Sequence, residues 1–506
     1  MGGELLDDEG IYEGDDGYKP ADDQDICQDK RSAQEANGEK GQGGRSLVEV
    51  LWRTVNHYFP WFNGCLKGLT DIRNQELIIY QRQTIIWAAL MALATKRQAR
   101  MKISYQMRQG EVCENLKGLS GQEDLKNVPH GDTVEYLMMR LKPEELEGLQ
   151  VRMIKGLLRN RVLEDYRLQG KHYTVAVDGV YTHSFDYEHC PHCLRRMDKE
   201  TGRTVWFHAK LQASLVSPTG LCLAMVSEWI ENDGNYDKQD CEIAAFKRLI
   251  VKLRGYFPKL PICLLLDALY GGQPIFEAIE EVRMEWIVVF KEGRWSTLYP
   301  WVMSIKGLCA KDNVIEEIEE EEIEDRSKRS HGQRLERKRP QNKKRVRLRE
   351  TTYTWMTGIE VPTKDRYPFN VMTCKDVVDG QKICDYVWLV SNGLNLNRDN
   401  IKVLTQRGGR CRWKIENEGI NTQKNGGYGL EHLYSRDEVS MKIWCALIDI
   451  AHTICQLIER GSLITMKLYG SLRNLAREMF DHMRYYVYRP PPKVKRIQIR
   501  LDYNTS

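Results

Sequence analysis

Two aspartates stand where a metal-dependent active site could assemble. Asp178 directly follows the apolar run Val175–Val177, and Asp267 directly follows Leu264–Leu266. Ligands gather at the carboxyl ends of strands in open α/β sheets, so the two carboxylates are expected to meet there. For each aspartate alone, a strand-end turn or a helix cap is the alternative. Burying a charge beside apolar strands is costly without compensation, and the matching positions favour a shared site.

Glu416 is the third candidate acid. It lies four residues after Arg412, so the two side chains share one face if the segment is helical. Taken alone, an ordinary surface ion pair is the alternative. Carboxylates suit Mg²⁺, which prefers oxygen ligands. Two such ions about 4 Å apart can activate a water and stabilise the leaving oxyanion when a phosphodiester is cut.

The segments that must position these acids alternate between strand and helix patterns. Their order is strand, hairpin, helix, strand, helix, strand, which is the order of an RNase H-like core. We therefore expect an α/β fold with an RNase H-like catalytic core, interrupted by a mostly β insertion and flanked by helical N-terminal and C-terminal regions. The patterned segments are His172–Val177, Val205–Val216, Leu221–Ile230, Asp237–Phe257, Pro261–Leu266, residues 273–283 and Trp286–Phe290.

Shifts in composition divide the chain into parts. The first part is too poor in apolar residues to offset its ordering entropy, so we expect it to be disordered. The helical part after it is either a DNA-binding domain or a plain helical scaffold with a basic end. The expected parts are a disordered tail (1–45), a helical N-terminal domain (46–167), the first part of the core (168–294), a β-rich insertion with a charged loop (295–395), the second part of the core (396–460), and a helical region with a basic tail (461–506).

Composition excludes some classes of protein. The net charge of +4 does not announce a nucleic-acid binder, although charges come in blocks, acidic at Glu316–Asp325 and basic at Arg326–Arg349. The basic block could contact DNA phosphates, or it could be a solvated loop attracted to the acidic block. The sequence has no signal peptide and no apolar run of about 20 residues, so we expect a cytoplasmic protein. Its 14 cysteines are then reduced thiols.

Three stretches carry a resemblance to a known family. They are Val177–Val180, Leu266–Tyr270, and Arg410–Lys424 together with Gly429–His432. The chain resembles the DDE transposases of bacterial insertion sequences, in particular the cut-and-paste group with a β insertion before the last acid. The resemblance covers roughly residues 170–460. It implies that Asp178, Asp267 and Glu416 are a catalytic triad that binds Mg²⁺, with Mn²⁺ as a substitute.

In that group the last acid lies in a helix pattern of Tyr, two residues, Arg, three residues, Glu, six residues and Lys. Arg412 and Glu416 fit it, whereas Gly409 stands at the Tyr position and Gln423 at the Lys position, with Lys424 next. The resemblance implies that Arg412 and Lys424 bind DNA. It also makes Trp355 a candidate for stacking on a flipped base, the alternative being a tryptophan in the core of a strand.

The resemblance implies a transposase in the bacterial cytoplasm, associated with the nucleoid. It would bind terminal inverted repeats as a homodimer, cut DNA with Mg²⁺ and join the freed 3′-hydroxyl to target DNA. A nuclease on the same core without strand transfer is one alternative. A non-catalytic DNA-binding protein derived from a transposase is another.

A second group of residues has the spacing of metal ligands. Cys190 and Cys193 form a Cys-x-x-Cys pair. A structural zinc ion needs four nitrogen or sulfur ligands in a tetrahedron. His183, His189 and His208 are candidates for the remaining ligands. The alternative is a loop with reduced cysteines and no metal.

Overall fold

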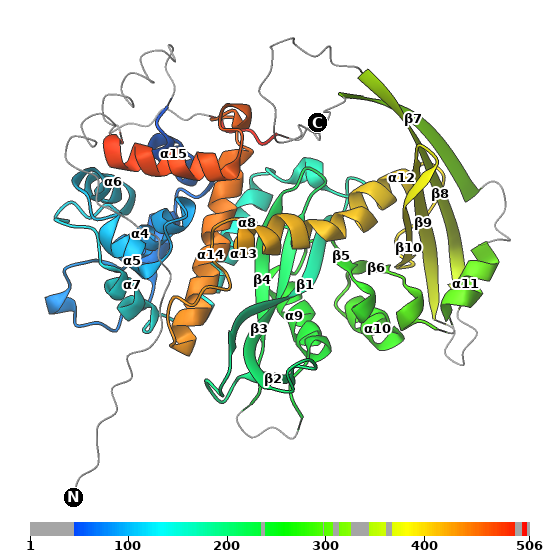
Figure 1. Cartoon of the computed structure of the whole chain (residues 1–506), viewed down its shortest axis with the longest axis horizontal. Helices are drawn as coiled ribbons and strands as arrows, with labels where there is room; N and C mark the ends of the chain where they lie inside the picture. The colour runs from blue at the N-terminus through cyan, green and yellow to red at the C-terminus, as the bar shows by residue number, and fades with distance from the viewer. Residues whose placement is uncertain are drawn as a thin grey trace, which may run out of the picture. The chain divides into compact units, whose positions relative to one another are not determined.

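A ten-stranded mixed β-sheet runs through the described part of the chain. The computed structural model describes residues 45–233, 238–296, 298–306, 313–324, 344–360, 367–490 and 498–502. The strand order is β2-β3-β1-β5-β6-β10-β9-β8-β7, with β4 paired to β3 (Figure 1). The strands are β1 (Tyr173–Phe185), β2 (Leu194–Met197), β3 (Thr204–Val216), β4 (Cys222–Ile230), β5 (Ile262–Leu266), β6 (Glu285–Val289), β7 (Val314–Glu324), β8 (Lys344–Glu360), β9 (Pro368–Val378) and β10 (Gln381–Val390).

Five strands of this sheet combine antiparallel and parallel pairing. β1, β3 and β4 form an antiparallel meander, and β5 and β6 run parallel to β1. All five residues of β5 are buried, which explains its continuous apolar sequence. The prediction that the first strand stops at Asp178 is wrong. β1 continues to Phe185 because Gly179 and the residues after it still pair with β3.

The predicted β insertion forms strands of the same sheet. β10 pairs antiparallel with β6, and β9, β8 and β7 follow outward. The acidic strand β7 pairs with the start of β8, so that Glu319 lies opposite Arg349. Opposite charges facing each other across strands stabilise such a ribbon. The centre of the charged loop, the predicted disordered tail and most of the predicted basic tail lie outside the described residues.

Helices before the sheet pack against the long helix α14 (Glu438–Glu459), which also contacts β4 (Figure 1). α14 is long and apolar enough to cross a membrane by length and composition, but 89% of that stretch is buried inside the protein. Burial explains its apolar sequence without a membrane. The N-terminal helices are α2 (Leu47–Tyr58), α3 (Phe62–Gly68), α4 (Arg82–Ala94), α5 (Arg100–Tyr105), α6 (Gly110–Ser120), α7 (Gly131–Met138) and α8 (Pro143–Arg159), with short turns η1 (Gln75–Leu77) and η2 (Glu164–Tyr166).

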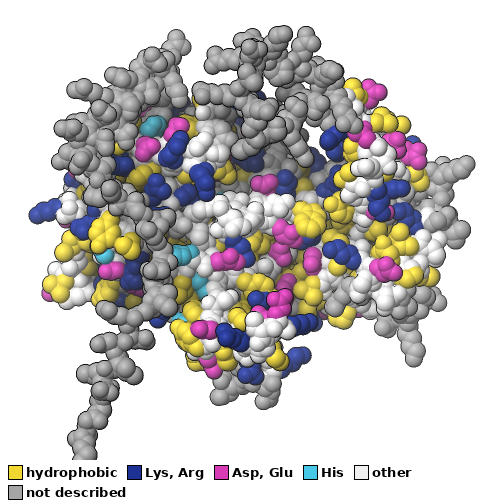
Figure 2. Space-filling view, in the orientation of Figure 1, with side chains coloured by type: hydrophobic (Ala, Val, Ile, Leu, Met, Phe, Trp, Pro, Cys, Tyr) yellow, Lys and Arg dark blue, Asp and Glu magenta, His cyan; other side chains and the backbone are white. Residues whose placement is uncertain are grey.

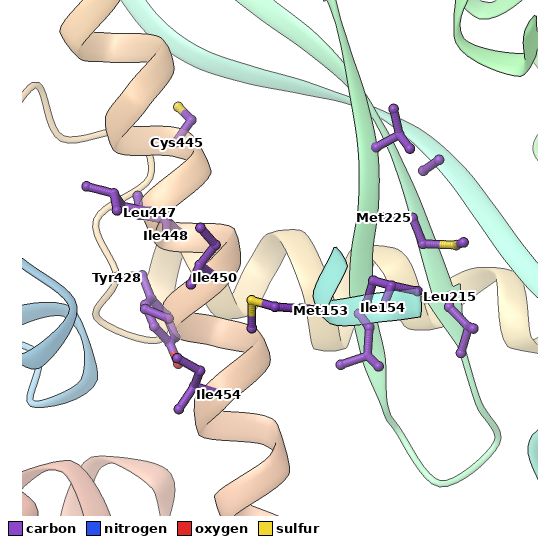
Figure 3. Close-up of a cluster of buried hydrophobic side chains, with 14 of the residues drawn as sticks. Met153, Ile154, Leu215, Met225, Tyr428, Cys445, Leu447, Ile448, Ile450 and Ile454 are labelled. Atoms are coloured by element: carbon purple, nitrogen blue, oxygen red, sulfur yellow. The ribbon is translucent and has the colours of Figure 1, made fainter. Parts of the chain in front are cut away.

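Buried hydrophobic side chains pack these helices against the sheet. Figure 3 shows Met153 and Ile154 of α8 between α14 and the strands that carry Leu215 and Met225. All four side chains are buried. The remaining helices are α9 (Glu242–Tyr256), α10 (Gln273–Glu281), α11 (Leu298–Lys306) and α15 (Leu472–Tyr485), with short turns η3 (Ala268–Tyr270), η4 (Glu292–Arg294) and η9 (Met466–Leu468).

An irregular helical segment, residues 401–425, crosses the sheet (Figure 1). Two stretches of it are π-helix, a form that is rare overall but often found at functional sites. The segment contacts β1, β4 and β5. Its consecutive parts are α12 (Ile401–Val403), η6 (Leu404–Gly408), η7 (Gly409–Arg412), η8 (Ile415–Ile420) and α13 (Asn421–Asn425).

Candidate active site

Strand register places the two aspartates level with each other. β1 and β5 are parallel neighbours, with Ala176 opposite Leu265. Two residues further along each chain, Asp178 lies within β1 and Asp267 follows the end of β5. The Asp267 carboxylate accepts a hydrogen bond of 2.6 Å from the backbone of Leu269 and so caps η3.

Glu416 reaches this region from the irregular helical segment. Its Oε1 lies 2.7 Å from Nη2 of Arg412, the ion pair that the spacing predicts. The pKa of Asp178 is raised to about 7, first by burial and then by the negative charge of Glu416, while Arg412 opposes the shift. The structure therefore brings Asp178, Glu416 and Arg412 within electrostatic reach of one another.

A fourth acid, Glu242, belongs to the same group and was missed from the sequence. It is the first residue of α9, and its Oε1 accepts a hydrogen bond from the Tyr270 hydroxyl. The pKa of Glu242 is raised overall, first by burial and also by the charge of Asp267, while the hydrogen bond from Tyr270 opposes the shift. A Cβ atom on Gly179 would lie 2.9 Å from Oε2 of Glu242, so glycine beside Asp178 makes room for this carboxylate.

No sequence pattern singles out Glu242. An acidic residue in the first turn of a helix is ordinary, because it complements the helix dipole. Only the packing of α9 against β3 and β4 brings this one to Asp267.

The four acids form a donor set that suits a hard cation. Their ligands would all be carboxylate oxygens, which Mg²⁺ prefers over nitrogen or sulfur. In the described residues, however, these oxygens are not drawn together as tightly as the Cys and His group below. Protein contacts already engage these carboxylates; Glu416, for example, pairs with Arg412, and Asp267 caps η3. A bound cation would compete with the Arg412 guanidinium for Glu416.

Arg412 is buried with donors to spare. Its side chain is 6% exposed, and one of its nitrogens binds Glu416. Nε and Nη1 are buried and have no hydrogen-bond partner in the described part of the chain. Leaving charged donors unpaired is costly, so the guanidinium has capacity for a further anionic group.

At two positions where the sequence departs from the helix pattern of the DDE transposases, packing leaves no room for the side chain of that pattern. A Cβ atom on Gly409 would lie 2.6 Å from the ring of Trp388, so a tyrosine has no room there. The Gln423 amide is buried and donates a hydrogen bond of 2.8 Å to Asp449. Lys424 forms an ion pair of 2.6 Å with Glu431.

Trp355, the predicted stacking residue, lies in the core. It is 4% exposed and belongs to a buried cluster with Met372 and Trp388. A flipped base cannot reach the ring in this conformation, so the structure agrees with the alternative interpretation of a core tryptophan.

The Cys-x-x-Cys pair lies beside two histidines. One ligand atom from each of His189, Cys190, Cys193 and His208 falls within 4.8 Å of the others. Sγ of Cys190 lies 3.7 Å from Sγ of Cys193. Nε2 of His208 lies 3.6 Å from the first sulfur and 3.4 Å from the second. His183 faces His208 across the β1–β3 pair but is not part of this group.

Comparisons with known proteins identify no family. No protein-family model and no curated protein matches the chain. Among solved structures, the chain is similar to one described as "Cryo-EM structure of piggyBac transposase synaptic complex with hairpin DNA". The sequences are 11% identical, the match covers 89% of this chain and 82% of that chain, and the TM-score is 0.37. This likeness is too distant to show a shared fold or function.

Proposed function

We propose that the chain is a DNA transposase that cuts and joins DNA strands with divalent cations at Asp178, Asp267 and Glu416. The observation that supports this proposal is that Asp178 and Asp267 stand at level positions on neighbouring parallel strands, with Glu416 close enough for its charge to raise the pKa of Asp178. The strand order β4-β3-β1-β5-β6, antiparallel and then parallel, is the order expected of an RNase H-like core and supports it.

The chain's own residues would prepare the reacting phosphate. Mg²⁺ or Mn²⁺, when bound by the acids, supplies the Lewis acid that activates water and stabilises the leaving oxyanion. When DNA binds, Arg412 would have to expose its spare donors, which are buried in this conformation, to place them on a nonbridging phosphate oxygen, where a guanidinium gives a directional contact. The same arginine orients Glu416 through their 2.7 Å ion pair. Glu242 adds a fourth carboxylate and is itself held by Tyr270.

Strand joining uses the same chemistry as cleavage. Both are in-line attacks at phosphorus, first by water and then by a DNA 3′-hydroxyl, so one set of acids serves both steps. The substrates would be terminal inverted repeats and target DNA, bound by a homodimer. On the face in Figure 2, described Lys and Arg side chains are interspersed with Asp and Glu rather than gathered into one stripe. We expect local contacts such as Arg412 and Lys424 to contribute to DNA binding.

A nuclease without strand transfer is the second candidate. The closed positions at Gly409 and Gln423 favour it, because the Tyr and Lys of the transposase pattern have no equivalent at these positions. Lys424 lies next to the second position but is paired with Glu431.

The test compares matched acid-to-amide variants on DNA that carries the sequences flanking the gene. Asp267→Asn and Glu416→Gln should bind this DNA but neither cut nor join it in Mg²⁺. Glu418→Gln is the control, because Glu418 lies on the same segment and pairs with Lys414. It should keep both activities.

Each outcome assigns a function. Cleavage without joined products from the wild type would favour the nuclease. Binding by the wild type without any cleavage in Mg²⁺ or Mn²⁺ would refute both enzymes. Cleavage that survives both amide substitutions would refute the assignment of the acids.

A further inference from the structure

We propose that His189, Cys190, Cys193 and His208 bind one structural zinc ion. This site is separate from the carboxylates of the proposed function and does not depend on them. Among the described residues, it is the group of possible metal ligands whose atoms all lie within 4.8 Å of one another.

The distances between the ligand atoms match a tetrahedral site. With zinc–sulfur bonds of about 2.3 Å and zinc–nitrogen bonds of about 2.0 Å, tetrahedral angles place two sulfurs about 3.8 Å apart and a sulfur and a nitrogen about 3.5 Å apart. The sulfurs of Cys190 and Cys193 are 3.7 Å apart. The nitrogen of His208 lies 3.6 Å and 3.4 Å from them.

The fold delivers the four ligands from two segments. His189, Cys190 and Cys193 lie between the end of β1 and the start of β2, and His208 lies within β3. The backbone N–H of Cys193 donates to the carbonyl of Cys190, which closes the turn between the two thiols. The side chain of Asn232 donates a hydrogen bond of 2.6 Å to the Cys193 carbonyl. Protein contacts thus shape the loop around the ligands.

Neighbouring groups decide which histidines are ligands. His192, the other histidine of the turn, is outside the group: its Nδ1 lies 2.9 Å from the Asn232 carbonyl and its Nε2 lies 4.0 Å from Oε2 of Glu438. The His189 ring stacks on Phe185 with centroids 4.3 Å apart and planes 14° apart. Nδ1 of His189 is buried without a partner in the described residues, as expected if the ring is oriented for a ligand that is not protein.

The two alternatives explain less. A disulfide needs sulfurs about 2.05 Å apart, far closer than the 3.7 Å between Cys190 and Cys193. A pair of reduced thiols explains the cysteines but not two imidazoles that converge on them from different segments. Two thiolates and two imidazoles in a tetrahedron are typical of zinc, and four protein ligands leave no open position for catalysis.

The site would brace the sheet beside the acids. It joins the far end of β1, the strand that carries Asp178, to β2 and β3. A cross-link there would hold the β1 extension in register without touching the carboxylates.

The test measures metal in the full-length protein, purified without added metal, by mass spectrometry. We expect about one zinc per chain in the wild type and a value near zero in Cys190→Ser. Cys241→Ser is the matched control, because Cys241 is an exposed free cysteine outside the group. It should keep the zinc of the wild type.

A second measurement covers the case in which the variant fails to fold. Wild-type protein loaded with Co²⁺ should show the thiolate-to-cobalt charge-transfer absorption and the visible bands of a tetrahedral site with sulfur ligands. Wild-type zinc near zero, zinc retained by folded Cys190→Ser, or a cobalt spectrum without thiolate absorption would each overturn the proposal. Loss of DNA cleavage in the carboxylate variants leaves this measurement unchanged, so the two proposals fail separately.

Discussion

Replacing Lys210 with methionine should strongly destabilise the protein. Its Nζ lies 2.8 Å from Oδ2 of Asp449, and both side chains are 2% exposed. Burial is the largest influence and lowers the pKa of Lys210, but the charge and hydrogen bond of Asp449, together with neighbouring groups, outweigh it, so the net shift is upward. The other oxygen of Asp449 accepts a hydrogen bond of 2.8 Å from Gln423. Lys210→Met therefore leaves a buried carboxylate with one neutral donor.

The expected loss is about 3–5 kcal/mol in the free energy of unfolding, the range for breaking a buried pair from one side. Replacing both partners, Lys210→Met with Asp449→Leu, removes the uncompensated charge and should recover most of that loss. Lys382→Met is the control, because its pair with Asp385 is 3.5 Å long and exposed. It should cost less than about 1 kcal/mol.

Urea denaturation at pH 7, followed by circular dichroism, measures the wild type, Lys210→Met, Asp449→Leu, the double variant and Lys382→Met. A loss under about 1 kcal/mol in Lys210→Met would refute the reasoning. So would a double variant as unstable as the sum of the two single variants, because the cost would then lie in packing rather than in charge. Such a result would also mean that the stability of α14 does not depend on the charge of Asp449. The hydrogen bond from Gln423 to Asp449 would then only place α13.

Three further predictions follow from particular contacts. Gly409→Tyr should lower the free energy of unfolding, measured by urea denaturation, by about 1–3 kcal/mol or more, because its Cβ would lie 2.6 Å from the Trp388 ring. Gly293→Tyr is the control, because a Cβ there meets no atom within 4 Å. Equal stability of the two variants would contradict the packing argument. Burial lowers the pKa of His452 to about 3, below the unfolded value of 6.5, so between these pH values the unfolded state binds more protons than the folded state. The free energy of unfolding should therefore fall by up to about 1.4 kcal/mol per pH unit as the pH drops from 6.5 to 3. His452→Gln should flatten this slope in a series of denaturation curves at different pH, and an unchanged slope would contradict the prediction. Glu242→Gln should raise the Mg²⁺ concentration for half-maximal cleavage about 10–100-fold, and an unchanged Mg²⁺ titration would exclude Glu242 from the site.

Local sequence patterns predicted the strands that carry the two aspartates, because an apolar run followed by an acid is a local signal. The level positions of Asp178 and Asp267 follow from parallel pairing of β1 with β5. The continuation of β1 to Phe185 did not follow, since Asp178 interrupts the apolar run although the backbone keeps pairing with β3. Strand pairing, which depends on a distant partner, overrode the local pattern.

Features set by contacts between distant segments could not be predicted. Glu242 resembles any acid at the start of a helix until α9 packs on the sheet. His208 was one of three candidate histidines, and the pairing of β2 with β3, in which Leu194 lies opposite Phe207, brought it to the thiols. The sequence offered the ligand types, whereas the fold selected among them.

The closed positions around Glu416 bear on how this protein would hold DNA. Gly409 lies against Trp388, and Gln423 is committed to the buried pair of Asp449 with Lys210. Neither position can send a side chain to phosphate without breaking the core. Phosphate contact near the acids would therefore depend on Arg412, whose spare donors are already buried there. If the proposed reaction occurs, it proceeds with Arg412 alone in place of the Tyr, Arg and Lys of the transposase pattern. Arg412→Lys should therefore impair the reaction more than any substitution at Lys424.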